Sequence, residues 1–263
     1  MTAPSEAMER RGYVPQLLTL VSQSAAQLVR APTATQRAAA ARRTGRQVLW
    51  LTLGGAAAIA VLMVGFDAIE IGLMPPRGTP DLWPVRILTD FGKDTYVLWG
   101  LAALVLVIGA VAPMSQRTSH AKLLRLGIHA EYLLLAVLLP VLVGEALKWA
   151  VGRGRPFVGG KANAFNFAPF TGTEAYFSLP SAHAITAFAL AFAVGAVWPR
   201  MRIAMALYAL AIGASRLVLL AHHPSDVVAG GLIGVLGAMA VRYWFAVREL
   251  GFVIDDAGKI AAR

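Results

Sequence analysis

Residues 124–147 read LRLGIHAEYLLLAVLLPVLVGEAL and are followed directly, at residues 148–156, by KWAVGRGRP. The first segment is long and apolar enough to cross the hydrocarbon core of a bilayer, which needs about 20 residues of helix. The second segment combines lysine and arginine with glycine and proline, which end helices. Together they predict a membrane-spanning helix that stops where the cations begin.

Apolar stretches of this kind recur along the chain, at about 48–67, 95–113, 124–147, 183–198, 201–221 and 226–247. The whole chain of 263 residues is 57% hydrophobic and only 14% charged, with a mean hydropathy of +0.63. Soluble domains carry about 25% charged residues. We therefore expect an all-α integral membrane bundle of six transmembrane helices. Its expected parts are an N-terminal tail (1–46), a membrane domain (47–250) and a C-terminal tail (251–263).

Positive charges alternate between the connecting segments. The segments rich in cations carry Arg10, Arg11, Arg30, Arg37, Arg42, Arg43, Arg46, Arg117, Lys122, Arg125, Arg200, Arg202, Arg242 and Arg248. Because short loops rich in lysine and arginine stay in the cytoplasm, both termini are predicted to be cytoplasmic. Loops 68–94, 148–182 and 214–226 are then predicted on the opposite, periplasmic face of a bacterial-type inner membrane.

Three segments carry most of the unusual chemistry. They are KWAVGRGRP at 148–156, PSAH at 180–183 and SRLVLLAHHPSD at 215–226. Cations can neutralise phosphate oxygens, and a histidine can attack phosphorus. All three segments fall on the predicted periplasmic face, although the topology rests only on apolar runs and cation counts. Phosphoryl chemistry at one membrane face is therefore predicted.

These segments resemble the three signature motifs of the type-2 phosphatidate phosphatase superfamily. That pattern is Lys, six residues, Arg-Pro; then Pro-Ser-Gly-His; then Ser-Arg, five residues, His, three residues, Asp. The chain departs from it only at Ala182, where the family has glycine. The resemblance covers roughly residues 90–250 and implies a membrane-bound lipid phosphatase.

The resemblance also implies catalytic roles. From the residues alone, His222 and His223 are equal candidates for the nucleophile that forms a phosphohistidine. The spacing from Ser215 and to Asp226 in the family pattern selects His222. Asp226 is then expected to hold the other ring nitrogen of His222, and His183 to protonate the leaving oxygen.

The phosphate group itself is expected to meet Lys148, Arg155 and Arg216, which would neutralise charge on the transferred group. Ser181 and the backbone amide of Ala182 would bind phosphate oxygens at a helix N-terminus. Alanine at position 182 has the same backbone N–H as the glycine of the family pattern. If the position required a positive φ, alanine would cost about 1 kcal/mol or more.

No metal site or cofactor is predicted. Glu131, Glu145 and Glu174 lack partners at ligand spacing, and the cations already supply what a magnesium ion would provide. Arg153 and Lys161 lie outside the matched pattern and are possible headgroup contacts. The net charge of +10 is explained by cytoplasmic loops, so no nucleic-acid partner is expected.

The predicted function is metal-independent dephosphorylation of a lipid phosphate or pyrophosphate. Candidate substrates are phosphatidate, phosphatidylglycerophosphate, polyprenyl pyrophosphate and lipid A. Two alternatives are a lipid phosphotransferase that uses the same site and a non-catalytic membrane protein that binds anions or lipids. The N-terminal tail has apolar residues at helical spacing from Val14 to Leu28, which fits either an amphipathic helix on the inner surface or a disordered tail.

Overall fold

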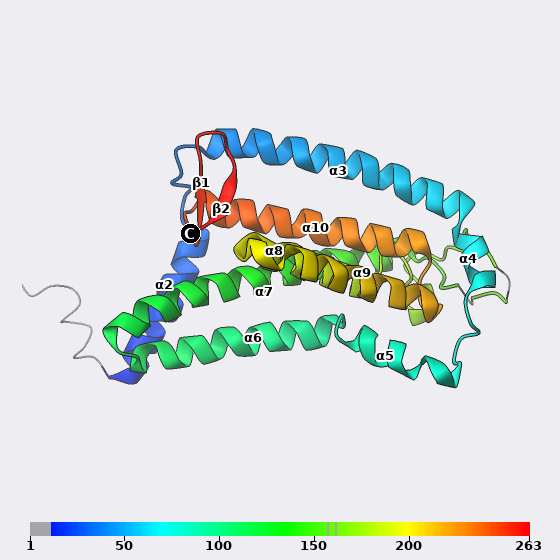
Figure 1. Cartoon of the computed structure of the whole chain (residues 1–263), viewed down its shortest axis with the longest axis horizontal. Helices are drawn as coiled ribbons and strands as arrows, with labels where there is room; N and C mark the ends of the chain where they lie inside the picture. Colours follow the sequence, from blue (N-terminus) through cyan, green and yellow to red (C-terminus); the bar gives the residue numbers. More distant parts are fainter. Residues whose placement is uncertain (1–11, 157, 161) are drawn as a thin grey trace, which may run out of the picture.

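The protein is a bundle in which the long helices α3, α6, α7, α9 and α10 lie roughly side by side, as the computed structural model shows (Figure 1). The structure describes residues 12–156, 158–160 and 162–263. In chain order, the elements are α2 (Tyr13–Val29), α3 (Arg37–Gly65), α4 (Asp67–Leu73), η1 (Pro80–Leu82), α5 (Trp83–Asp90), α6 (Asp94–Val111), η2 (Ala112–Met114), α7 (Arg117–Val151), η3 (Glu174–Tyr176), α8 (Ala182–Val197), η4 (Pro199–Met201), α9 (Arg202–Val218), α10 (Pro224–Ala246), β1 (Phe252–Ile254) and β2 (Ile260–Ala262).

Each apolar stretch predicted from the sequence coincides with a helix. Among the described residues, five helical segments are long and apolar enough to cross a membrane: Arg37–Gly65, Pro80–Met114, Ser119–Val151, Pro199–Val218 and Pro224–Ala246. The remaining one, α8, has 16 residues, fewer than the roughly 20 that a full span needs. The all-α membrane bundle is confirmed, and the count of six spans stays a prediction.

Helix α8 contacts α7, α9 and α10 and forms the centre of the bundle. Four alanines of α8 are fully buried, namely Ala184, Ala187, Ala189 and Ala193, and they lie on more than one side of the helix. On the facing side of α10, a Cβ on Gly230 would lie 2.5 Å from the carbonyl oxygen of Ser181, and one on Gly234 would lie 2.4 Å from that of Ile185. Glycines four residues apart let two helix backbones approach closely in a membrane. This contact fixes the first turn of α8 against the first turns of α10.

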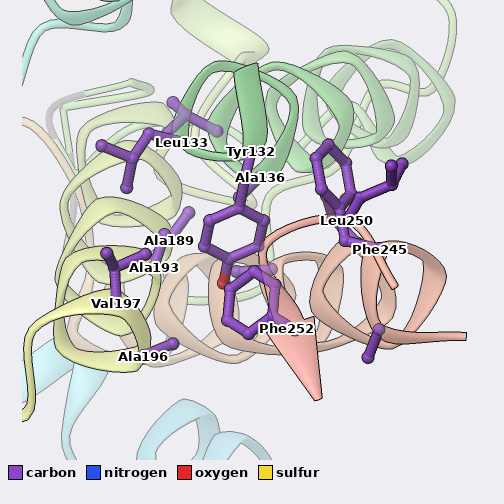
Figure 2. Packing of buried hydrophobic residues seen from close by; sticks show 14 of the residues in the cluster. Tyr132, Leu133, Ala136, Ala189, Ala193, Ala196, Val197, Phe245, Leu250 and Phe252 are labelled. Carbon is purple, nitrogen blue, oxygen red and sulfur yellow. The ribbon is translucent and has the colours of Figure 1, made fainter. Parts of the chain in front are cut away.

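An aromatic cluster closes the end of the bundle where the chain terminates (Figure 2). The ring of Tyr132 meets Phe245 and Phe252 edge-on, with centroid separations of 5.5 and 4.8 Å. Phe252 belongs to the antiparallel hairpin β1–β2, in which it pairs with Ala262. Residues 251–263 therefore include an ordered hairpin, and its first strand contributes to the hydrophobic core.

The described part of the N-terminal tail contains a helix, α2 (Tyr13–Val29), which packs against α6. The position of this helix on the inner membrane surface stays a prediction. Helix α3 starts at Arg37, ten residues before the predicted domain boundary at 47, because residues 37–46 (RAAAARRTGR) are rich in alanine and arginine, which favour helix.

Candidate active site

The three chemistry-bearing segments meet at the end of the bundle opposite the aromatic cluster. Helix α7 ends at Val151 and is capped by Gly152, which adopts a left-handed conformation with φ of 58°. A Cβ there would lie 2.0 Å from the carbonyl oxygen of Ala168, so only glycine fits. Helix α8 starts after Ser181, and α10 starts with Pro224 at its first position, where the fixed φ of proline suits a helix start.

His222 lies in the loop between α9 and α10 and is almost fully buried. Its Nδ1 lies 2.8 Å from the carbonyl oxygen of Ser178. Because a carbonyl can only accept, Nδ1 carries the proton and Nε2 keeps its lone pair. Burial, and then the charges of Arg216, Arg155 and Lys148, lower the pKa of His222 well below its usual value. A neutral imidazole with a free Nε2 suits a nucleophile.

Asp226 supports His222 by a different route from the one expected. Its carboxylate is 3.9 Å from Nδ1 of His222, too far for a hydrogen bond. It accepts instead from Oγ of Ser178 at 2.6 Å and from the backbone N–H of His223 at 2.9 Å. The reason is local: His223 precedes Pro224 in an extended conformation, so Asp226 in the first turn of α10 turns back to cap the helix. Asp226 is therefore linked to His222 through Ser178, whose hydroxyl bonds to Asp226 and whose carbonyl oxygen bonds to His222.

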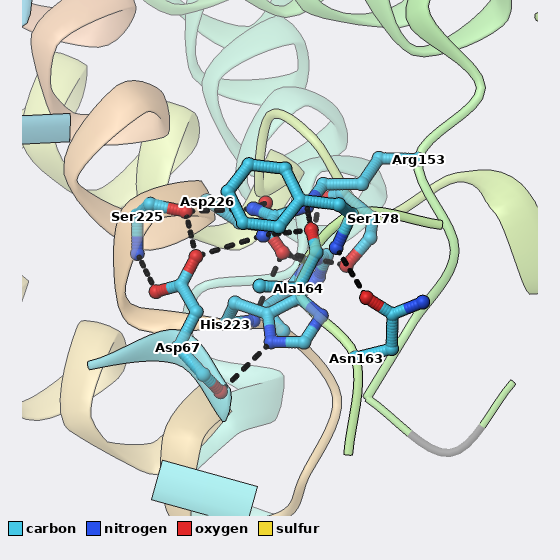
Figure 3. A network of polar contacts seen from close by, with 10 residues as sticks. Asp67, Arg153, Asn163, Ala164, Ser178, His223, Ser225 and Asp226 are labelled. Carbon is cyan, nitrogen blue, oxygen red and sulfur yellow. Dashed lines mark hydrogen bonds and ion pairs between the residues drawn. The ribbon is translucent and has the colours of Figure 1, made fainter. Parts of the chain in front are cut away.

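Arg153 is the centre of a buried polar network (Figure 3). Its guanidinium donates to Asp226 at 2.6 Å, to Asp67 at 2.8 Å and to the carbonyl oxygen of Ala164 at 2.7 Å. The side chain has no exposed surface, so the prediction that Arg153 contacts a headgroup is wrong. Lys161, the other residue considered for that role, lies outside the described residues.

No motif in the sequence identified Asp67 as a candidate site residue. It is the first residue of α4 and fully buried, and besides Arg153 it accepts from the hydroxyl and the backbone N–H of Ser225. The one available signal is a carboxylate at the end of the first apolar stretch, where an ionised group needs a partner. The network thus joins α4, the loop after α7 and the start of α10.

Each of the three predicted phosphate-binding cations makes an ion pair or a hydrogen bond with another residue of the chain. Nζ of Lys148 pairs with Glu145 at 2.6 Å, and Nε of Arg155 donates to the carbonyl oxygen of Glu174 at 3.0 Å. Arg216 donates from Nη1 to the hydroxyl of Thr89 at 2.8 Å, and its buried Nε has no hydrogen-bond partner among the described residues. Thr89 comes from α5 and carried no signal in the sequence.

The start of α8 has the groups expected of an anion-binding helix N-terminus. Ser181 precedes the first turn and is fully buried, and in the described part of the chain its hydroxyl has no hydrogen-bond partner. Ala182 is the first residue of α8 and is not among the residues with positive φ. Alanine therefore fits this position without backbone strain and keeps its N–H. His183 follows, half-buried at the second position of the helix.

His223, the rival of His222, lies behind the site. It is fully buried, and its Nδ1 is 3.4 Å from the backbone carbonyl oxygen of Asp67. Its backbone caps α10 through Asp226. The surroundings of His223 are those of the buried network, whereas His222 lies within the influence of three cations. Within the residues that the structure describes, no group of three or more histidine, aspartate or glutamate side chains could hold a metal ion.

A membrane bundle that brings a neutral histidine, a second histidine, a buried serine hydroxyl and three cations to one end has the parts of an integral membrane phosphatase. Comparison with known proteins gives its family. Residues 130–249 match the PAP2 superfamily, and the chain belongs to that superfamily, which confirms the resemblance seen in its three motifs.

Its relatives include two proteins named lipid A 1-phosphatase. The one from Rhizobium johnstonii is 31% identical over 212 residues, covering 80% of this chain and 84% of that protein. The one from Rhizobium etli is 32% identical over 179 residues, covering 67% and 76%. The bacitracin transport permease protein BcrC of Bacillus licheniformis is 27% identical over 175 residues, covering 64% and 81%. No solved structure matches the chain significantly. The chain is thus a bacterial membrane protein.

The buried Arg153 network makes the charge of Asp67 necessary for stability. In Asp67→Asn the shape is kept, but the guanidinium loses half of its neutralisation, so we expect the free energy of unfolding to fall by about 1–3 kcal/mol. Thermal melting of the purified protein in detergent measures this. Asp81→Asn, which changes an exposed carboxylate in η1, is the matched control. Equal melting temperatures for Asp67→Asn and the control would contradict the role given to this network.

Glu70 on α4 predicts a pH dependence. Its carboxyl is buried, and neither oxygen has a hydrogen-bond partner among the described residues. Burial, and then the charges of Asp67 and Asp226, raise its pKa from 4.5 to about 7. Since the folded state holds this proton more tightly than the unfolded state, the contribution of Glu70 to stability is full below pH 4.5 and is lost as the pH rises through 7.

Replacing Glu70 with glutamine removes that loss. We expect Glu70→Gln to raise the melting temperature relative to the unmodified protein at pH 8 and to give a smaller or no gain at pH 5. Glu249→Gln, at an exposed glutamate near the other end of the bundle, serves as the control. A gain for Glu70→Gln that is the same at both pH values would show that the effect does not come from titration.

Proposed function

We propose that the chain removes a phosphate group from a lipid through a phosphohistidine on His222, at the periplasmic face of a bacterial inner membrane. Its activity as a lipid phosphatase rests on the PAP2 superfamily match and on the two relatives named lipid A 1-phosphatase. The observation that supports the mechanism best is the hydrogen bond from Nδ1 of His222 to the carbonyl oxygen of Ser178. That bond leaves Nε2 free beside the cations.

In the first step, the Nε2 lone pair of His222 forms a bond to phosphorus, and the bond from phosphorus to the leaving oxygen breaks. His183 in its protonated form, which the negative charge of the bound phosphate favours, gives its proton to that oxygen, which departs as the dephosphorylated lipid. In the second step, His183 takes a proton from a water molecule that attacks phosphorus. The P–N bond then breaks, which releases inorganic phosphate and restores neutral His222.

Lys148, Arg155 and Arg216 neutralise the phosphoryl oxygens as charge shifts between them. The hydroxyl of Ser181 and the amide of Ala182 donate to the same group from the start of α8. The buried Ser181 hydroxyl and Arg216 Nε, which have no hydrogen-bond partner among the residues that the structure describes, support this assignment, because buried polar groups are normally satisfied. No step in this scheme calls for a metal ion.

Lipid A is the first substrate to test, since two relatives carry that substrate in their names. The experiment is phosphate release by purified protein in detergent, with EDTA present, from lipid A, phosphatidate, phosphatidylglycerophosphate and polyprenyl pyrophosphate. We expect release in EDTA, preference for one of these lipids, and a loss of at least about a thousandfold in His222→Ala. His120→Ala, which removes a histidine near the other end of α7, should retain full activity.

The result also separates hydrolysis from phosphotransfer. Loss of the substrate's phosphate without free phosphate, together with a phosphorylated second lipid, would identify a phosphotransferase that uses the same site. Complete loss of activity in EDTA would contradict a metal-independent mechanism. Full activity in His222→Ala would contradict the assigned nucleophile.

The proposed orientation has both termini in the cytoplasm and the active site in the periplasm. It is supported by the cation-rich segments at one end and by the position of all three motifs at the other. Because the chain has no cysteine, single cysteines can report on it. In spheroplasts, an impermeant maleimide should label Thr171→Cys but label Asp256→Cys only after lysis. The reverse pattern would overturn the orientation.

A further inference from the structure

A cavity lies between α8, α9 and α10, and none of the proposed catalytic or phosphate-binding residues lines it. It has a volume of about 480 Å³, and its walls are mostly apolar, formed in part by Phe188, Phe192, Leu210 and Val235. It also includes Arg242, which follows Asp226 by 16 residues on α10. At 1.5 Å per residue, this separation is about 24 Å along the helix. The cavity therefore belongs to the end of the bundle away from His222.

Two arginines reach this cavity, Arg202 from the start of α9 and Arg242 from near the end of α10. The guanidinium of Arg242 lies over the ring of Phe192, 4.9 Å from its centroid, and Nε of Arg242 is buried with no hydrogen-bond partner in the described part of the chain. Nε of Arg202 donates to the carbonyl oxygen of Gly195 at 3.0 Å.

No carboxylate among the described residues forms an ion pair with either arginine. Arg202 is exposed at the start of α9 and Arg242 is partly buried near the end of α10, so both guanidinium groups lie at the rim of an apolar cavity, where the anionic headgroup of a lipid can pair with them.

The cavity continues into an apolar groove of about 570 Å³ between α3, α9 and α10, because both are lined by Phe188, Leu210 and Val235. This groove contains no charged residue in its lining. The combined space thus has a cationic end and an apolar extension along the bundle. A small soluble anion would fill only the cationic end, whereas a lipid would fill both.

We infer that Arg202 and Arg242 bind the headgroup phosphate of an anionic phospholipid from the leaflet opposite the active site. One acyl chain lies in the apolar groove between α3, α9 and α10. Guanidinium groups bind phosphate through paired hydrogen bonds, and basic pockets between transmembrane helices are suited to anionic lipids. The cationic end of the site is separate from the proposed reaction, since Arg242 lies about 24 Å along α10 from Asp226.

The test measures how much phosphatidylglycerol the purified protein retains, by native mass spectrometry after mixing with equal amounts of phosphatidylglycerol and phosphatidylcholine. We expect the unmodified protein to retain phosphatidylglycerol preferentially and the double variant Arg202→Gln, Arg242→Gln to retain at least about fivefold less. The matched control is Arg200→Gln, an exposed arginine of η4 that is not part of the cavity lining; this variant should behave like the unmodified protein.

Two further measurements test whether the double variant has lost lipid binding for reasons other than the two arginines, and whether the ligand is a lipid. If the double variant does not fold, the single variant Arg202→Gln must show reduced retention, because that side chain is exposed and its loss should be tolerated. Addition of inorganic phosphate at millimolar concentration should not displace the lipid. Equal retention by all variants, or displacement of the lipid by inorganic phosphate, would overturn the proposal.

Discussion

The ion pairs of Arg153 with Asp67 and Asp226 are the constraint on which the site depends. All three side chains are fully buried, and an unpaired charge in such surroundings would cost several kcal/mol. The guanidinium can be satisfied only when α4, the loop after α7 and the start of α10 are all in position. Folding of these three segments is therefore coupled, although they are far apart in the sequence.

From this network the geometry of His222 follows in two steps. Asp226, held by Arg153, accepts a hydrogen bond from the hydroxyl of Ser178. The carbonyl oxygen of Ser178 accepts a hydrogen bond from Nδ1–H of His222. The backbone N–H of Ser178 in turn donates to the carbonyl oxygen of Arg153 at 3.0 Å. One buried arginine thus orients the proposed nucleophile without touching it, as outer hydrogen bonds commonly fix the tautomer of a working histidine.

Much of the architecture could be predicted because a membrane-spanning helix is determined by the apolar residues of its own segment. An apolar run such as 124–147 must be helical in a bilayer, where every backbone polar group has to be satisfied within the segment. The motif spacing likewise pointed to His183, His222 and the three cations, which the fold brings to one end of the bundle. Helix α8 packs directly on the backbone of α10 because Gly230 and Gly234 leave room for it.

The rest depended on contacts between distant segments, which composition and periodicity do not reveal. Arg153 appeared to be a loop cation, and only the fold shows Asp67, 86 residues earlier, as its partner. Ser178 carries no distinguishing pattern, yet it provides both the hydroxyl and the carbonyl that connect Asp226 to His222. The hairpin at 252–262 was equally hidden, because strands of three residues leave too little periodicity to detect.

The most direct test of this account is to identify the phosphorylated atom of the enzyme. Substrate labelled at its phosphate would be mixed with the protein, the reaction stopped with alkali within milliseconds, and the product analysed by peptide mass spectrometry and ³¹P NMR. The account predicts an acid-labile phosphate on His222, attached at Nε2, because Nδ1 is occupied by the carbonyl oxygen of Ser178. Phosphate on Nδ1 of His222, or on any other residue, would contradict it.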